Sequence, residues 1–454
     1  MNRPITKLHS FSIFCFLSIG ISFNIHAQFD QFSESYSTLS TIAGKGEMDD
    51  RSQSGWLVEY ENGSALDAEL TRPHFAMADS AGNIYIADKD AHGIRKVTPE
   101  GIISTVAGTI SAGDNGDGVG TESQLSSPNG IWVKADGTVY ILDLGNNKIR
   151  RLNTNGMLET VVDDPNGIAI GRGLWVTPNE DSIFYASSST VKLWTTLGGI
   201  ENYSTGYASL GNICMDKNGY LIATDRGGHT VYRIAKDGTS KEVIAGNGGT
   251  SGGGHGQLAT ETGLAEVRGV WFLDDNSYFL ATHEGSQVWY VDNNGRIYLF
   301  LDGRNGDEYH SGDGENYQTP GFKISEARSV TVDYEGNVLI TENDLGFVRK
   351  IQNDYVYYYT STIESIRNQQ QIALAYPNPV TDYLYFNSNY ANDNLKSFKL
   401  YNQVGAVILS RELASTQNNM LKIDCRNIEN GVYYYELSDI DNKKQVGTVL
   451  ISHE

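Results

Sequence analysis

The chain has 454 residues, with 55 acidic against 34 basic side chains and a formal net charge of -21. A surface this acidic repels phosphate backbones and anionic lipid, which excludes nucleic acid as a partner and argues against a membrane surface. The 49 glycines and 27 tyrosines suit a chain of short strands and tight turns, and the length allows two or three domains.

The first 28 residues have the features of a signal peptide. Arg3 and Lys7 form a basic end, residues 11–23 are apolar, and small residues near Ala27 offer a cleavage site. We therefore expect residues 1–28 to be a signal peptide that takes the chain into the periplasm.

Six variants of one phrase follow, at 82–101, 137–156, 181–199, 219–238, 276–295 and 336–354. Each contains two short β-prone runs joined by a polar loop. An apolar run precedes each copy, and a fourth run follows most of them. Four antiparallel strands repeated in this way are the blade of a β-propeller. The sequence therefore predicts an all-β chain with a six-bladed β-propeller over residues 29–360.

Two segments could close the ring of blades. Residues 40–44 resemble the fourth strand of a blade but lie at the N-terminus, so they could complete the last blade. Residues 355–359 could fill the same place because they directly follow the last hairpin. We favour closure by the N-terminal strand.

A polar linker is expected at 361–372, followed at 373–454 by short alternating strands typical of a small Ig-like β-sandwich. The residues around Pro377, Asn378, Pro379, Gly405 and Gly431 resemble the type A C-terminal sorting domain of the type IX secretion system. That resemblance implies export across the outer membrane of a Bacteroidota-type bacterium, with the type IX machinery as partner. The product would then be secreted or held at the outer cell surface.

The propeller repeats resemble the NHL family. The second repeat matches best, through 103–108, 113–118, 127–131, 139–143 and 147–150. NHL propellers include RNA binders, protein-interaction modules and sensor domains, and related propellers include lactonases and an amidating lyase. The resemblance therefore implies a fold without choosing a function.

The innermost strands of a propeller converge on its axis, and the residues that open them should face a central funnel. Aligning the repeats gives His74, Asn129, Arg172, Gly211, Arg268 and Arg328; Asn166 competes for the third position, and Arg172 is preferred because 172–175 parallels 268–271. The loop inside each hairpin should lie on the same face and supplies Asp88, Asp143, Ser187, Asp225, His283 and Glu342. The arginines could form a receptor for a carboxylate or sulfate. Alternatively, each arginine pairs with a neighbouring acid and holds the blades in register.

Metal catalysis is disfavoured, because arginines beside a divalent cation would oppose its binding. No GxSxG nucleophile elbow is present, because the one literal match, at 249–253, lies in a glycine-rich stretch with no following helix pattern. Asp114 and Asp117 resemble a fragment of a calcium loop, although a family turn is the simpler interpretation. No cofactor is therefore expected, with calcium left possible. Trp56 lies in a long loop, where it could stack on a sugar or pack against a blade.

These features favour a monomeric ligand-binding or interaction module over an enzyme. We expect a glycan or a surface protein as the propeller's ligand. The alternative is a lactonase-like hydrolase or a lyase that uses the central funnel.

Overall fold

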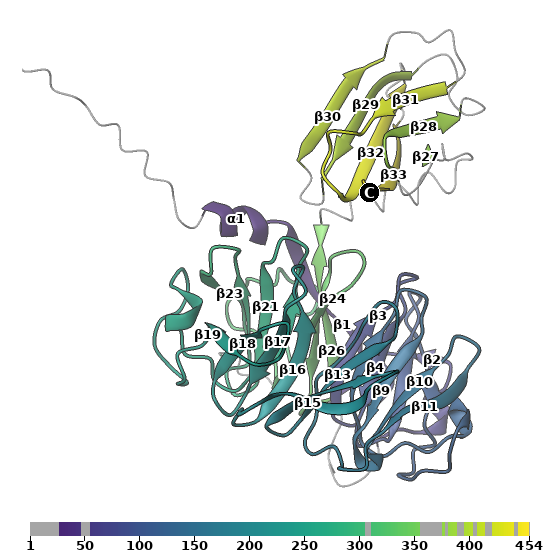
Figure 1. Cartoon of the computed structure of the whole chain (residues 1–454), viewed down its shortest axis with the longest axis vertical. Coiled ribbons are helices and arrows are strands. Elements are labelled where there is room, and N and C mark those ends of the chain that lie inside the picture. The colour runs from purple at the N-terminus through teal and green to yellow at the C-terminus, as the bar shows by residue number, and fades with distance from the viewer. Residues whose placement is uncertain are drawn as a thin grey trace, which may run out of the picture.

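The computed structural model describes residues 27–46, 55–304, 310–354, 375–376, 380–387, 395–402, 406–413, 420–439 and 444–453. Strands dominate these residues, and the chain begins its described part with the helix α1 (Ala27–Ser33) (Figure 1). No helix within the described ranges is long and apolar enough to cross a membrane. Most of the predicted signal peptide, residues 355–359 and the linker lie outside the described residues.

Six antiparallel sheets occupy residues 36–353, one for each repeat, and we number them 1 to 6 in chain order. Sheet 1 contains β2 (Gly63–Ser64), β3 (Pro73–Ala78), β4 (Ile84–Asp88), β5 (Gly93–Val97) and β6 (Ile102–Ala107). Sheet 2 contains β7 (Gly118–Val119), β8 (Pro128–Val133), β9 (Val139–Asp143), β10 (Lys148–Leu152) and β11 (Met157–Asp163). Sheet 3 contains β12 (Leu174–Val176), β13 (Ser182–Ser187), β14 (Thr190–Thr195) and β15 (Gly199–Thr205).

The remaining sheets follow the same plan. Sheet 4 contains β16 (Leu210–Met215), β17 (Leu221–Asp225), β18 (Thr230–Ile234) and β19 (Lys241–Ala245). Sheet 5 contains β20 (Val267–Phe272), β21 (Tyr278–Thr282), β22 (Gln287–Val291) and β23 (Ile297–Asp302). Sheet 6 contains β24 (Ala327–Val332), β25 (Val338–Glu342), β26 (Phe347–Asn353) and β1 (Tyr36–Ala43).

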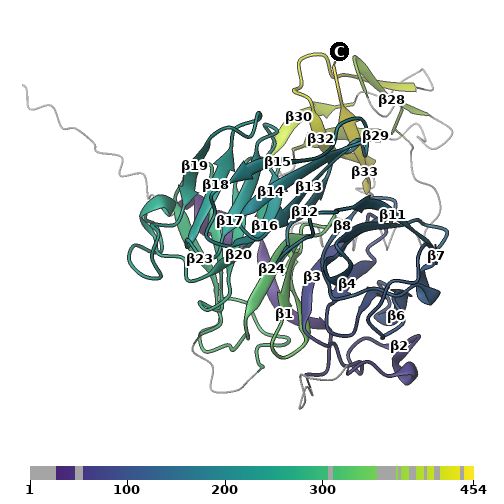
Figure 2. The same cartoon turned by 60° about the horizontal axis from the view of Figure 1, so that its bottom comes forward.

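The six sheets form a closed ring. The innermost strand of each sheet contacts the innermost strand of the next. These strands are β3, β8, β12, β16, β20 and β24. Strand β24 contacts β3 and so completes the circle. Figure 2 shows β3, β12, β16, β20 and β24 gathered toward the middle of this ring. This arrangement is that of a β-propeller, as the repeats predict.

The N-terminal strand closes the ring. Strand β1 pairs antiparallel with β26, with Leu39 opposite Ile351 and Ala43 opposite Val348. The side chain of Leu39 is completely buried. The pairing removes the unpaired edge that β26 would otherwise expose. The prediction of N-terminal closure is confirmed.

Apolar layers between neighbouring sheets hold the ring together. The alternation of apolar residues in the strands sends one set of side chains toward each adjacent sheet. The largest layer lies between sheets 5 and 6, where Phe29 and Phe32 of α1 join Tyr36, Phe279 and Tyr290. Phe29 stacks on Tyr298 with ring centres 4.5 Å apart. Each such buried ring contributes roughly 1.5–3 kcal/mol to stability.

The C-terminal residues form a second, separate core. Strands β27 (Ala375–Tyr376), β28 (Tyr383–Asn387) and β31 (Met420–Asp424) form one sheet. Strands β29 (Leu395–Tyr401), β30 (Val407–Glu412), β32 (Gly431–Asp439) and β33 (Lys444–Ile451) form the other. Phe386 of the first sheet contacts Phe398 and Tyr435 of the second, at centroid distances of 5.8 and 4.8 Å. Two sheets over one apolar core make the predicted sandwich.

Candidate functional site

The residues that open the innermost strands lie where those strands are irregular. His74, Asn129, Arg268 and Arg328 are the second residues of their strands, and Arg172 precedes β12 by two residues. The ladder shifts register at this point in β3, β8, β16, β20 and β24. A bulge releases a residue from the ladder and re-aims its side chain. The equivalent position in β16 is Gly211, where a Cβ would lie 2.4 Å from the hydroxyl oxygen of Thr224.

Two glutamates hold two of these arginines. Arg268 donates to Glu266 at 2.5 Å, and Arg328 donates to Glu326 at 3.0 Å. His283 lies between the two carboxylates, with Nδ1 3.2 Å from Glu266 and Nε2 in contact with Glu326. These contacts support the pairing interpretation for Arg268 and Arg328. Sequence reasoning missed Glu266 and Glu326, although each precedes its arginine by two residues.

Arg172 has no such partner. Its Nε and Nη1 atoms are buried, and neither has a hydrogen-bond acceptor within the described ranges. Burial, followed by the positive charges of Arg268, Arg328 and Arg226, lowers the pKa of Arg172 to about 8. A guanidinium left in this state is costly because a buried charge needs both a counter-charge and hydrogen bonds.

Other polar groups around Arg172 are also unsatisfied. Both ring nitrogens of His74 and the Oδ1 of Asn129 are buried without a partner in the described structure. Burial and the charges of Arg328 and Arg172 hold the pKa of His74 well below its usual range. The Nδ2 of Asn129 donates to the carbonyl of Gly171 and so anchors the residue before Arg172. We call Arg172, His74, Asn129, Arg268 and Arg328 the axial cluster.

The carboxylates expected to face the funnel do something else. Asp88, Asp143, Asp225 and Glu342 are buried at the ends of their strands. Each accepts a hydrogen bond from a backbone N–H of the segment before an inner strand; the donors are Thr71, Ser126, Ala208 with Ser209, and Ser325. Ser187 accepts in the same way from Ala169. The expectation that these side chains line a ligand site is wrong, because their oxygens are used inside the framework. Only His283 of this group reaches the axial cluster.

Three of these carboxylates each pair with a different buried arginine. Arg95, Arg150 and Arg349 lie in β5, β10 and β26, and all three are completely buried. Arg95 pairs with Asp88 at 3.2 Å, Arg150 with Asp143 at 3.5 Å and Arg349 with Glu342 at 2.9 Å. Each pair links the strand of its arginine to the neighbouring strand that carries the carboxylate, which is β4, β9 or β25.

Ion pairs with basic side chains also involve the two calcium candidates, Asp114 and Asp117. Asp114 pairs with Lys148 at 2.6 Å, and Asp117 pairs with Arg150 at 3.2 Å. Cationic side chains therefore stand where calcium would have to bind, and the loop serves as a framework contact. No group of three or more possible metal ligands occurs among the described residues.

Trp56 is not an exposed stacking residue. It is buried, with the guanidinium of Arg95 over its ring at 3.8 Å. Its Nε1 donates to Glu61 at 3.0 Å. The alternative that it packs against a blade is the correct one.

Sequence reasoning also missed three tryptophans on the inner strands, Trp132, Trp175 and Trp271. Each lies three positions after a residue of the axial cluster and is half-buried. The ring of Trp132 lies 5.7 Å from that of Trp175 and 6.1 Å from that of Trp271. The signal was present as a glycine, an aliphatic residue and a tryptophan in three of the repeats, at 130–132, 173–175 and 269–271.

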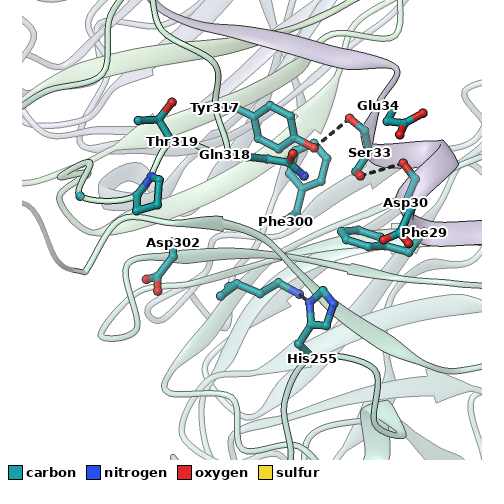
Figure 3. A pocket seen from close by; sticks show the side chains of 13 residues that line it. Phe29, Asp30, Ser33, Glu34, His255, Phe300, Asp302, Tyr317, Gln318 and Thr319 are labelled. Atoms are coloured by element: carbon teal, nitrogen blue, oxygen red, sulfur yellow. Dashed lines mark hydrogen bonds between the residues drawn. The ribbon is translucent and has the colours of Figure 1, made fainter. Parts of the chain in front are cut away.

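A groove lies elsewhere, at the outer edge of the ring beside α1 (Figure 3). Its volume is about 560 Å³, and the carboxylates of Asp30, Glu34 and Asp302 line it together with His255. Tyr317 donates to the carbonyl of Ser33 at 3.0 Å, which fixes α1 on one side of the groove. Its acidic lining is opposite in charge to the axial cluster.

Comparison with known proteins identifies the C-terminal part. Residues 374–452 match the model of the secretion system C-terminal sorting domain. The C-terminal sandwich is a sorting domain. Within the sorting domain, Gly431 begins β32, whereas Pro377, Asn378, Pro379 and Gly405 lie outside the described residues. The sorting domain indicates export by type IX secretion, to the cell surface or the medium.

The propeller is similar to parts of larger proteins and to several solved structures. Mouse teneurin-3 is 34% identical over 22% of this chain and 4% of its own length. Zebrafish teneurin-3 is 26% identical over 53% of this chain and 9% of its own length. The chain thus spans less than a tenth of these relatives. A Bacteroides thetaiotaomicron protein of unknown function superposes with a TM-score of 0.53 at 14% identity, covering 69% of this chain and 75% of that one. An auxiliary nutrient binding protein from Bacteroides ovatus superposes with a TM-score of 0.51 at 13% identity. The superposition covers 70% of this chain and 76% of that one. These likenesses show the propeller fold alone.

Proposed function

We propose that this chain is an exported NHL-type propeller that binds an anionic ligand at its axis, as a monomeric module at the outer surface or in the medium. The observation that carries the proposal is the unpaired guanidinium of Arg172. Its buried Nε and Nη1 lack acceptors in the described structure, and the charges nearest to it include three more arginines. A carboxylate or sulfate would accept from both donors and supply the missing negative charge.

The charge balance supports an anion rather than a cation. Arg172, Arg226, Arg268 and Arg328 interact with one another, whereas Glu266 and Glu326 are the carboxylates in contact with them. The axis is therefore positive within a protein of net charge -21. Anions, among them acidic glycans and acidic segments of surface proteins, are drawn to such a centre.

The two interpretations of the arginines can be separated because the structure divides them. Arg328 has a carboxylate partner and Arg172 has none within the described residues. The experiment is isothermal titration of the mature chain with sulfate and with D-glucuronate, using glucose as a neutral probe. Wild type should bind the two anions, R172M should bind them at least tenfold more weakly, and neither should bind glucose.

Arg304 provides the control, since it is half-exposed and paired with Asp302. R304Q should bind as wild type does. Equal binding of sulfate and glucuronate by wild type and R172M, or no binding by wild type, would overturn the proposal.

A further inference from the structure

The three inner-strand tryptophans meet at the axis of the ring. Trp132 belongs to sheet 2 and Trp271 to sheet 5, which lie three places apart in a ring of six and therefore face each other across the axis. Their rings stack with an interplanar angle of 29° and a centroid distance of 6.1 Å. Trp175 of sheet 3 lies against the same pair. All three are half-buried, so part of their indole surface remains accessible.

The tryptophans form a second layer beneath the axial cluster. Trp132, Trp175 and Trp271 follow Asn129, Arg172 and Arg268 by three positions on the same segments. Three residues of extended chain span roughly 10 Å. The axis therefore carries charge at one level and flat aromatic surface roughly 10 Å further along.

The unsatisfied atoms of the axial cluster define what else the ligand must offer. The donors of Arg172 need an anionic acceptor, but the Oδ1 of Asn129 needs a hydrogen-bond donor. A neutral imidazole such as His74 presents one donor and one acceptor. A hydroxyl group can serve as both donor and acceptor, whereas a bare sulfate or an aromatic carboxylate supplies acceptors only.

We propose that the ligand of the axial site is an acidic saccharide of at least two rings. Its carboxylate or sulfate binds Arg172, its hydroxyls bind His74 and Asn129, and its far ring packs on the part of the Trp132 and Trp271 indoles that remains accessible. Sugar rings present C–H groups on their flat faces, which pack on the large apolar surface of an indole. This inference rests on the proposed function and adds the substrate class to it.

The test is a titration of tryptophan emission in the mature chain with digalacturonate, D-glucuronate, sulfate and cellobiose. Digalacturonate should shift the emission of wild type and bind at least tenfold more tightly than glucuronate. In W271L the affinity for digalacturonate should fall at least tenfold. W194L is the matched control, because Trp194 is also half-buried but lies in the third strand of sheet 3.

The outcomes separate this inference from the proposed function. If sulfate binds in an Arg172-dependent way but digalacturonate binds no tighter than glucuronate and leaves the emission unchanged, the saccharide inference is wrong and the anion site stands. If no anion binds, both are wrong. Tighter binding of a peptide carboxylate than of digalacturonate would also overturn the saccharide. The wild-type emission decides these points even if W271L fails to fold.

Discussion

Replacing Arg172 by methionine should stabilise the protein in the absence of ligand. The pKa of about 8, against an ordinary value of 12.5, corresponds to roughly 6 kcal/mol at about 1.4 kcal/mol for each factor of ten. This is an upper limit, because Arg172 is only half-buried and the solvent screens part of its charge. Exchanging buried charges for apolar side chains of similar volume gains about 1–4 kcal/mol in other proteins. We expect R172M to gain about 1–3 kcal/mol.

The assay is urea unfolding and calorimetry of the mature chain at pH 7 in dilute chloride. A gain of this size raises Tm by roughly 2–4 °C per kcal/mol. R328M is the matched comparison and should be less stable than wild type, because it removes the arginine that pairs with the partly buried Glu326. Saturating sulfate should remove the advantage of R172M, since a ligand at 100 times its Kd stabilises wild type by about 2.7 kcal/mol. A lower Tm for R172M than for wild type in dilute chloride would refute the reasoning.

Three further perturbations follow from the framework. R349M leaves the buried Glu342 unpaired and should lower the free energy of unfolding by about 3–5 kcal/mol, whereas R304M, at a half-exposed pair, should change it by less than about 1 kcal/mol; equal losses in urea titrations would contradict this difference. L39A in the closing strand should cost about 2–5 kcal/mol and increase protease cleavage near β26, and an unchanged urea midpoint would argue against closure by β1. Burial raises the pKa of Asp143 to about 6, above its unfolded value, so its contribution to stability is present at low pH and is lost as the pH rises through 6. Wild type should therefore gain up to about 3 kcal/mol over D143N between pH 6 and pH 4, and a constant difference across that range would exclude this origin.

Periodicity and turn chemistry were sufficient to predict the strands and the closing partner. Gly82 and Gly137, for example, adopt positive φ angles in the hairpin turns that the repeats mark. Periodicity and turn chemistry do not predict the direction in which a side chain points. Asp88 and His283 occupy equivalent loop positions, yet one turns inward to a backbone N–H while the other reaches the axis. A local ladder irregularity lies at His74, Asn129, Arg268 and Arg328, and a repeat alignment contains no information about bulges.

The tryptophan layer shows a different limit. Trp132 and Trp271 are separated by 139 positions in the sequence and contact each other only because sheets 2 and 5 face across the ring. A pattern within one repeat predicts a strand, but a contact between repeats requires the order and closure of the whole ring. The stacking role expected for Trp56 was wrong for another reason. The position of a tryptophan in a long loop does not indicate that a buried arginine covers its ring.

The strand that closes the ring has a consequence for how the chain is made. Ser37 of β1 donates to Asp354, a partner 317 positions away. Bringing such distant ends together carries an entropic cost of roughly 5 kcal/mol, which nothing offsets until the last strand exists. Strand β1 therefore has no partner until β26 has been made, and the sorting domain follows β26 in the chain. A product truncated before β26 leaves the edge of β1 unpaired and lacks the sorting domain.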